Sequence, residues 1–133
     1  MDRMIFVNLP VGDLAASRAF YAGLGLAVDD ASGDDVVVCV VVTGRVCLML
    51  QDRATFPLLT GRPVSDPAVG TPVRLCLTAT SRAEVDVLVA GALSAGGTEL
   101  GTARCDPTFY ARTVTDPDGH VWELLHADGP TAG

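Results

Sequence analysis

The sequence is poor in basic residues, in aromatic residues and in long apolar runs. Its 133 residues include 9 Lys+Arg against 16 Asp+Glu, so the formal net charge is −7. Because nucleic acids and anionic membranes attract clustered basic residues, we expect neither of them as a partner. The longest apolar run, residues 36–42, is far shorter than the roughly 20 residues of a membrane-spanning helix. The start of the chain lacks a signal-peptide pattern, so we expect a cytoplasmic protein.

The four cysteines form no CxxC pair. Cys39, Cys47 and Cys76 lie within apolar runs, and only Cys105 lies in a polar stretch. We interpret them as small hydrophobic residues in a reducing compartment, and not as a disulfide framework or a zinc site. Apolar residues, in contrast, make up 49% of the chain, which is enough for the buried core of one compact domain.

The first half of the chain has the pattern of a βαβββ unit. Residues 4–11 favour a strand, and Asp13 can cap a helix that ends at about Leu24. Two apolar strands then flank a short turn at Thr43-Gly44, which is typical of a hairpin.

The second half has the same order of elements. Residues 73–79 favour a strand, and Ser81 to Glu84 form a capping box before an amphipathic helix. Residues 99–104 favour a short strand, and two further strands flank the turn Asp116-Pro117-Asp118-Gly119. We therefore predict a duplicated module: module 1 at about 4–52, a proline-rich connector or lid at 53–71 and module 2 at about 72–128.

Two segments carry a family resemblance: PVGDLAASRAFYAGLGL near the start and TVTDPDGHVWELL near the end. They resemble the vicinal oxygen chelate superfamily, which includes glyoxalase I, extradiol dioxygenases, fosfomycin- and bleomycin-resistance proteins and methylmalonyl-CoA epimerase. The resemblance implies an α+β fold in which two βαβββ modules form a cup-like, partly open, eight-stranded mixed sheet with helices outside. It implies a ligand inside the cup and no particular activity, because this fold serves several chemistries.

The resemblance also implies four metal-ligand positions, which in this sequence are Phe6, Leu48, Arg74 and Glu123. Only Glu123 is a metal ligand, because Phe6 and Leu48 lack lone pairs and Arg74 carries a permanent positive charge. Asn8, on the expected face of Phe6, adds only an amide oxygen. We therefore expect no metal and no other cofactor.

A charge-paired Glu123 is our hypothesis instead. If the Asp116–Gly119 turn closes a regular hairpin, Arg112 lies opposite Glu123, and Arg74 can approach the same carboxylate from the side of the other module. Otherwise both arginines point at solvent. Tyr110 shares the expected face of Arg112, so these groups can hydrogen-bond an anionic or carbonyl-bearing ligand.

Together these observations favour a small-molecule-binding protein of the glyoxalase/bleomycin-resistance type that lacks a catalytic divalent metal. Its expected ligand-binding residues are Phe6, Asn8, Leu48, Arg74, Tyr110, Arg112 and Glu123. The acidic balance suits a cationic ligand, whereas the arginines suit an acceptor-rich one.

Two other functions stay open. One is an enzyme of the same superfamily, a lyase, epimerase or dioxygenase with an atypical or metal-free site, and metal analysis discriminates it from a binder. The other is a protein-interaction module, because residues 36–42 suit a subunit interface. We expect a homodimer.

Overall fold

The computed structural model describes residues 3–34, 37–66 and 69–128. In chain order these residues form β1 (Ile5–Val11), α1 (Leu14–Gly23), β2 (Ala27–Asp34), β3 (Val37–Thr43), β4 (Val46–Asp52), α2 (Phe56–Thr60), β5 (Arg74–Thr78), α3 (Arg82–Ser94), β6 (Thr98–Asp106), β7 (Phe109–Thr115) and β8 (Val121–Ala127). The duplicated βαβββ order is therefore confirmed. The short helix α2 lies in the connector, where the proline content predicted no element.

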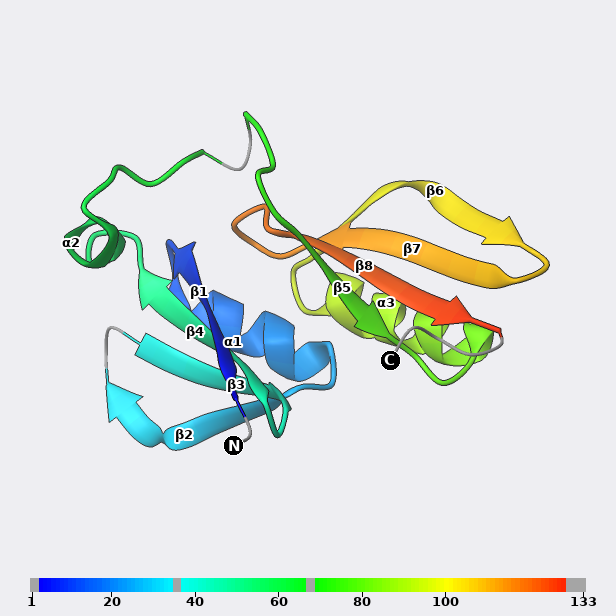
Figure 1. Cartoon of the computed structure of the whole chain (residues 1–133), viewed down its shortest axis with the longest axis horizontal. Helices are drawn as coiled ribbons and strands as arrows, with labels where there is room; N and C mark the ends of the chain where they lie inside the picture. Colours follow the sequence, from blue (N-terminus) through cyan, green and yellow to red (C-terminus); the bar gives the residue numbers. More distant parts are fainter. Residues whose placement is uncertain (1–2, 35–36, 67–68, 129–133) are drawn as a thin grey trace.

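The strands divide into two four-stranded mixed sheets that do not close into a barrel (Figure 1). Their orders are β1-β4-β3-β2 and β5-β8-β7-β6. In each sheet the first strand pairs in parallel with the last strand of its module, and the other pairs are antiparallel. Each module therefore has its first strand at the edge of its sheet.

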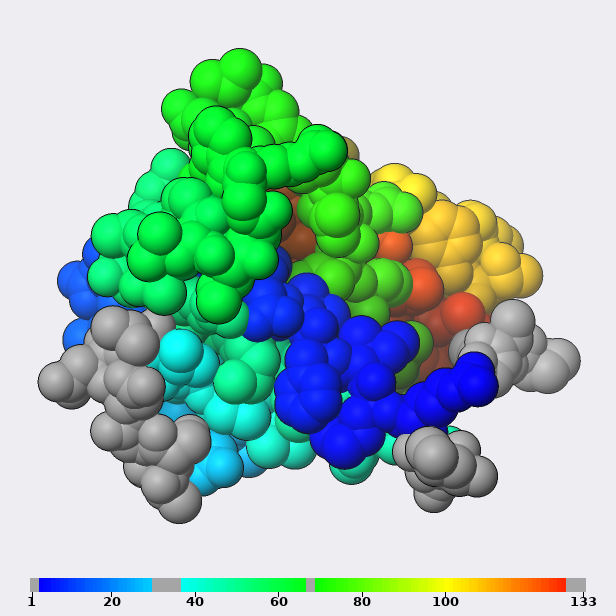
Figure 2. Space-filling model, turned by 60° about the vertical axis from the view of Figure 1, so that its left-hand side comes forward, coloured from blue at the N-terminus to red at the C-terminus, as the bar shows by residue number. Residues whose placement is uncertain are grey.

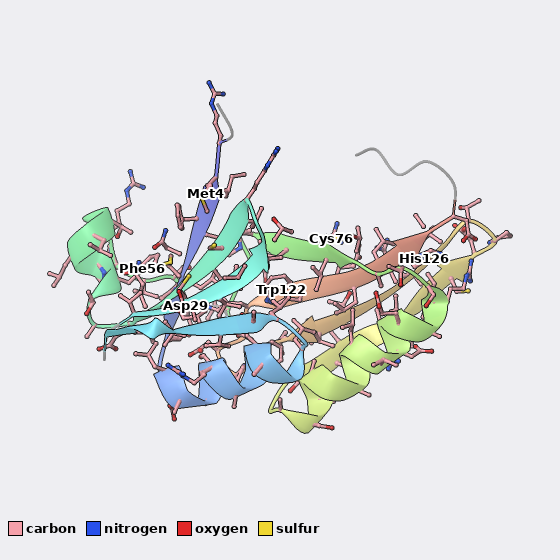
Figure 3. The ribbon with its side chains drawn as sticks, turned by 90° about the horizontal axis from the view of Figure 1, so that it is seen from below. Met4, Asp29, Phe56, Cys76, Trp122 and His126 are labelled. Carbon is pink, nitrogen blue, oxygen red and sulfur yellow. The ribbon has the colours of Figure 1, made fainter. Side chains whose placement is uncertain are left out.

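Side-chain caps start both long helices as the sequence predicts. The Asp13 carboxylate accepts a hydrogen bond from the Ala16 backbone N–H at 3.1 Å, and the Ser81 hydroxyl accepts one from Glu84 N–H at 3.0 Å. Both α1 and α3 lie on one side of the sheets (Figure 3), and we refer to the opposite side, which neither helix covers, as the concave face of the cup-like fold. The core lies between helices and sheets and includes the buried side chain of Trp122. Within the described residues no helix is long and apolar enough to span a membrane.

The two modules pack through their helices and through the loop after β7. A Cβ added to Gly91 of α3 would lie 2.2 Å from the backbone oxygen of Gly23 in α1, so the helices approach at a contact that only glycine permits. From the loop, Asp118 accepts hydrogen bonds from Gly12 N–H at 2.8 Å and from the Ser17 hydroxyl at 3.3 Å.

A buried polar network completes this junction. The Tyr21 hydroxyl donates to Asp116 Oδ2 at 2.7 Å and accepts from the Trp122 indole N–H at 3.1 Å. Burial raises the pKa of Asp116 and raises the pKa of Tyr21 well above its usual value. The Asp116–Gly119 sequence is therefore more than a turn: its carboxylates hold module 1 against module 2.

Candidate functional site

The polar centre of the concave face is the buried carboxylate of Glu123. The Glu123 side chain, on β8, is 5% exposed and accepts a hydrogen bond from Arg74 Nη1 of β5 at 3.2 Å. A second guanidinium, that of Arg104 on β6, donates to the same Oε2 atom. The Cys76 thiol of β5 lies 3.7 Å from the other carboxylate oxygen, Oε1. We call these four residues the Glu123 cluster.

Strand register explains why these side chains meet. In the parallel pair of β5 and β8, Cys76 is the register partner of Glu123, so both side chains leave the sheet on one face. Figure 3 shows Cys76 on the side of β5 away from the helices. Arg74 lies two residues before Cys76 and shares that face.

The cluster carries a net positive charge at its surface. Glu123 neutralises only one of its two guanidiniums, and the side chains of Arg74 and Arg104 are each 57% exposed. The Phe109 ring lies 5.6 Å from the Arg104 guanidinium carbon, which restricts this side chain further. The arrangement therefore presents N–H donors to the solvent above a buried carboxylate, in a chain whose overall charge is −7.

Cys76 is held in its neutral form beside this carboxylate. Loss of hydration raises the pKa of the Cys76 thiol, and the adjoining Glu123 charge raises it further. A raised thiol pKa leaves less thiolate at neutral pH, so Cys76 is a poor nucleophile in this arrangement.

The predicted pairing of Arg112 with Glu123 is wrong. Thr115 pairs with Val121, and Thr113 is the register partner of Glu123. The loop is one residue longer than the expected regular turn, and a one-residue slip moves every side chain of a strand to the opposite face. Arg112 therefore points towards α3.

There Arg112 and Tyr110 form a second polar group with α3. Arg112 donates to both carboxylate oxygens of Glu99 at 2.8 and 2.7 Å and to Asp86 at 2.9 Å. The Tyr110 hydroxyl donates to Asp86 at 2.5 Å. The hydrogen bonds from Tyr110 and Arg112 lower the pKa of Asp86, and the bonds from Arg112 lower the pKa of Glu99. Tyr110 and Arg112 share a face as predicted, but it is the face covered by α3 and not the concave one.

Leu48 also lies away from the concave face. It is 1% exposed and packs in the hydrophobic core, because a register shift in the β3–β4 hairpin offsets the count from the turn by one residue. Met49 takes that place: it pairs with Asn8 and shares its face. Phe6 lies on β1 with 53% of its surface exposed. The Asn8 amide oxygen accepts a hydrogen bond from Gln51.

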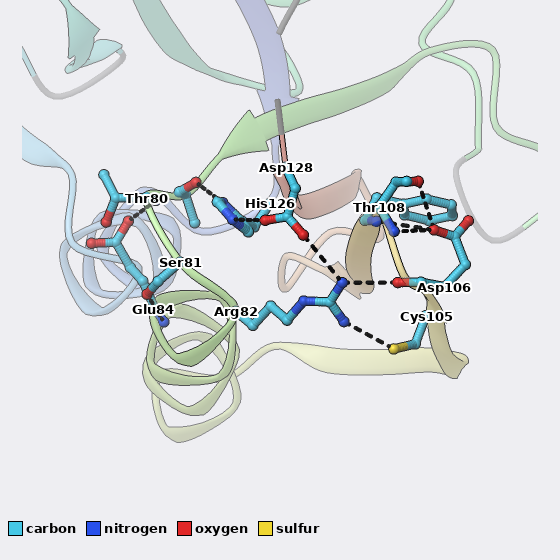
Figure 4. Close-up of polar contacts among 11 residues, drawn as sticks. Thr80, Ser81, Arg82, Glu84, Cys105, Asp106, Thr108, His126 and Asp128 are labelled. Atoms are coloured by element: carbon cyan, nitrogen blue, oxygen red, sulfur yellow. Dashed lines mark hydrogen bonds and ion pairs between the residues drawn. The ribbon is translucent and has the colours of Figure 1, made fainter. Parts of the chain in front are cut away.

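Cys105 and His126 belong to a structural cluster at the start of α3 (Figure 4). Arg82 donates to Cys105 Sγ at 3.2 Å and to the Asp106 backbone oxygen at 2.8 Å. His126 has Nδ1 3.0 Å from the Ala79 oxygen and Nε2 3.0 Å from Asp128 Oδ1. Both ring nitrogens therefore face protein oxygens, and neither points to an open coordination position.

Comparisons with known proteins identify the family. A sequence model of the Glyoxalase/Bleomycin resistance protein/Dioxygenase superfamily matches residues 3–124. The chain belongs to this superfamily. Among curated proteins, none matches the sequence.

Solved structures of this superfamily and related proteins share the fold. A hypothetical protein from S. aureus is 26% identical, with a TM-score of 0.82 and coverage of 96% of this chain and 95% of that one. A glyoxalase-related enzyme from Fulvimarina pelagi is 25% identical, with a TM-score of 0.80 and coverage of 95% and 88%. TnmS3, an antibiotic binding protein from Streptomyces sp. CB03234, is 22% identical, with a TM-score of 0.65 and coverage of 96% and 98%. The last likeness concerns the fold alone.

The donor set at the superfamily's metal positions does not fit a divalent cation. A catalytic cation needs about three ligands from His, Cys, Asp or Glu, and the described residues contain no such group. Glu123 is the one carboxylate at these positions, and its Oε2 atom already accepts from two guanidiniums. A cation here would face Arg74 and Arg104 at close range, and like charges repel.

Proposed function

We propose that this superfamily member binds a small organic ligand through an anionic group, in place of the metal-bound ligand that its family resemblance implies. The observation that carries the proposal is the pair of half-exposed guanidiniums on one buried carboxylate. Glu123 orients Arg74 and Arg104 and leaves N–H donors of each for a ligand. Planar guanidiniums suit carboxylates, because the two groups can form paired hydrogen bonds.

The charge balance of the cluster supports an anion over a cation. Two positive groups face one negative group, so a bound carboxylate brings the local charge to neutrality, whereas a cation adds to an existing excess. The fold is compatible with this role, because its structural neighbours include both an enzyme and a binding protein. In this proposal Glu123 positions the arginines and is not a general base.

Calorimetric titration with benzoate and with its neutral isostere benzamide tests the proposal. We expect the protein to prefer benzoate, and Arg104→Gln to weaken benzoate binding by about tenfold or more, because a charge-assisted hydrogen bond is lost. Arg62→Gln is the matched control: it removes the same charge from an exposed residue of the connector. Equal binding of both probes, or equal losses in both variants, would contradict the proposal.

Metal addition separates the binder from an enzyme of the superfamily. After purification, we expect no stoichiometric Mn(II), Fe(II), Ni(II) or Zn(II), and no change in benzoate affinity when these ions are added. A stoichiometric ion whose binding is lost in Glu123→Gln would favour the enzyme instead.

We also propose that the protein is a homodimer. β1 is an edge strand, and its first half exposes Ile5 and Phe6 together with Met4 before it. Figure 2 shows this strand, in blue, across the surface of the molecule. An exposed apolar edge favours association with a second copy. Light scattering is expected to give a dimer mass, and a monomer mass at all concentrations would refute this part.

A further inference from the structure

A cavity of about 210 Å³ lies between the two modules. No residue of the Glu123 cluster lines it, although its lining residue Leu75 lies between Arg74 and Cys76 in β5. Four parts of the chain line it: the second half of β1, the connector, the start of β5 and residues 119–121 at the start of β8. Phe56 reaches it from α2, which Figure 3 shows on the far side of β1 from β5. In Figure 2 the connector, in green, projects above β1. The connector therefore forms one wall of this inter-module cavity.

The lining of the inter-module cavity is apolar and uncharged. Most of its surface comes from hydrophobic side chains, among them Phe56, Val64, Leu75 and Val121, and it includes no Asp, Glu, Lys or Arg. A charged ligand would lose its hydration here without gaining an ionic partner, which is costly. The cavity therefore selects against charged molecules, in contrast to the Glu123 cluster.

Two polar side chains give the cavity one donor and one acceptor. The Asn8 amide oxygen accepts from Gln51, while its N–H₂ group has only a long contact of 3.4 Å to the Phe6 oxygen. His120 Nε2 lies 2.8 Å from the Pro10 carbonyl oxygen, which can only accept, so Nε2 is the donor of this bond. In the tautomer that carries its proton on Nε2, Nδ1 is an acceptor. A hydroxyl group, which both donates and accepts, complements this pair.

A buried polar atom of β4, next to Asn8, also lacks a hydrogen-bond partner within the described residues. This atom is the Oε1 of the Gln51 side chain. Its amide N–H₂ already bonds to Asn8, which lines the cavity. Buried polar atoms are usually satisfied, so an orphaned acceptor beside Asn8 indicates that a donor is missing from this region.

The volume sets the size of the ligand. An apolar cavity of about 150 Å³ is sufficient for benzene in a protein core. The volume of about 210 Å³ therefore admits one ring with a small substituent. We infer that the inter-module cavity is a second ligand site, which binds a neutral monocyclic aromatic molecule that bears a hydroxyl group.

Phenol and benzoate titrations followed by amide NMR test this inference, which does not depend on the proposed anion site. We expect phenol to shift the signals of Val64, Thr71 and Val121, and benzoate to leave them unchanged. Saturating benzoate should alter the phenol affinity by less than about twofold. Phenol shifts confined to the Glu123 cluster, mutual displacement of the two probes, or no phenol shifts at millimolar concentration would overturn the inference.

A pair of connector variants adds a second readout. Val64→Trp fills the cavity from its connector wall and should weaken phenol binding by about tenfold or more. Val69→Trp places the same side chain at a connector position that is 85% exposed and does not line this cavity, so it should change the affinity by less than about twofold. Equal phenol affinities in the two variants would overturn the inference. An unchanged NMR signal of the buried Trp122 indole N–H verifies that both variants fold.

Discussion

Replacing Tyr21 with phenylalanine removes one hydroxyl that serves two buried partners. Trp122 N–H loses its acceptor, which costs about 1–3 kcal/mol, and Asp116 loses a charge-assisted hydrogen bond worth about 1.5–3 kcal/mol. Asp116 Oδ1 keeps the N–H groups of Asp118 and His120, each at 2.9 Å, so its loss lies towards the lower end. We expect the free energy of unfolding to fall by about 2.5–4.5 kcal/mol.

Urea unfolding monitored by tryptophan fluorescence measures this loss, because Trp122 is the one tryptophan of the chain. With a slope of about 2 kcal/mol per molar, the midpoint should fall by about 1–2 M. Tyr110→Phe is the matched control: it also loses a bond to an aspartate, but Asp86 is 54% exposed and keeps Arg112. Its expected loss is below about 1 kcal/mol. Equal losses in the two variants would refute the role of the Tyr21 network.

Three further predictions concern the same framework. Because burial raises the pKa of Asp116, ionisation of this carboxyl group costs stability. The wild-type protein should therefore lose stability relative to Asp116→Asn as the pH rises above 3.8, the usual pKa of the group. A stability difference that does not depend on pH would contradict this prediction. Arg112→Leu should lower the free energy of unfolding by about 1–3 kcal/mol at neutral pH, because it removes the ion pair with Glu99. This loss should shrink as the pH falls below 4.5 and through the lowered pKa of Glu99. The control Arg82→Leu, which removes a more exposed ion pair, should lower the free energy of unfolding by less. Gly91→Ala should destabilise by about 1–3 kcal/mol in thermal melts, although alanine normally stabilises a helix, because its Cβ would lie 2.2 Å from a backbone oxygen of α1; a rise in melting temperature would show that the helices separate freely.

Local sequence signals predicted the elements well. Capping residues and apolar periodicity each depend on neighbours within one turn of chain, so Asp13 and Ser81 were sufficient to place the starts of α1 and α3. The ion pair of Arg74 with Glu123 was expected as well, but from the side of the other module, whereas both residues lie on paired strands of one sheet.

Hairpin register could not be read from the turns. One extra residue in the loop after β7 turned Arg112 away from the concave face, and a register shift in the β3–β4 hairpin did the same to Leu48. Arg104 was missed because β6 pairs irregularly with β7 between Leu100 and Arg104. The available signal was that Arg104 is the one basic residue of β6.

The most direct measurement of the anion site is a crystal structure grown with both benzoate and Mn(II) present. We expect the benzoate carboxylate within hydrogen-bond distance of Arg74 and Arg104, with Glu123 still buried beneath them. A manganese ion coordinated by Glu123, with both arginines displaced into solvent, would contradict the central claim.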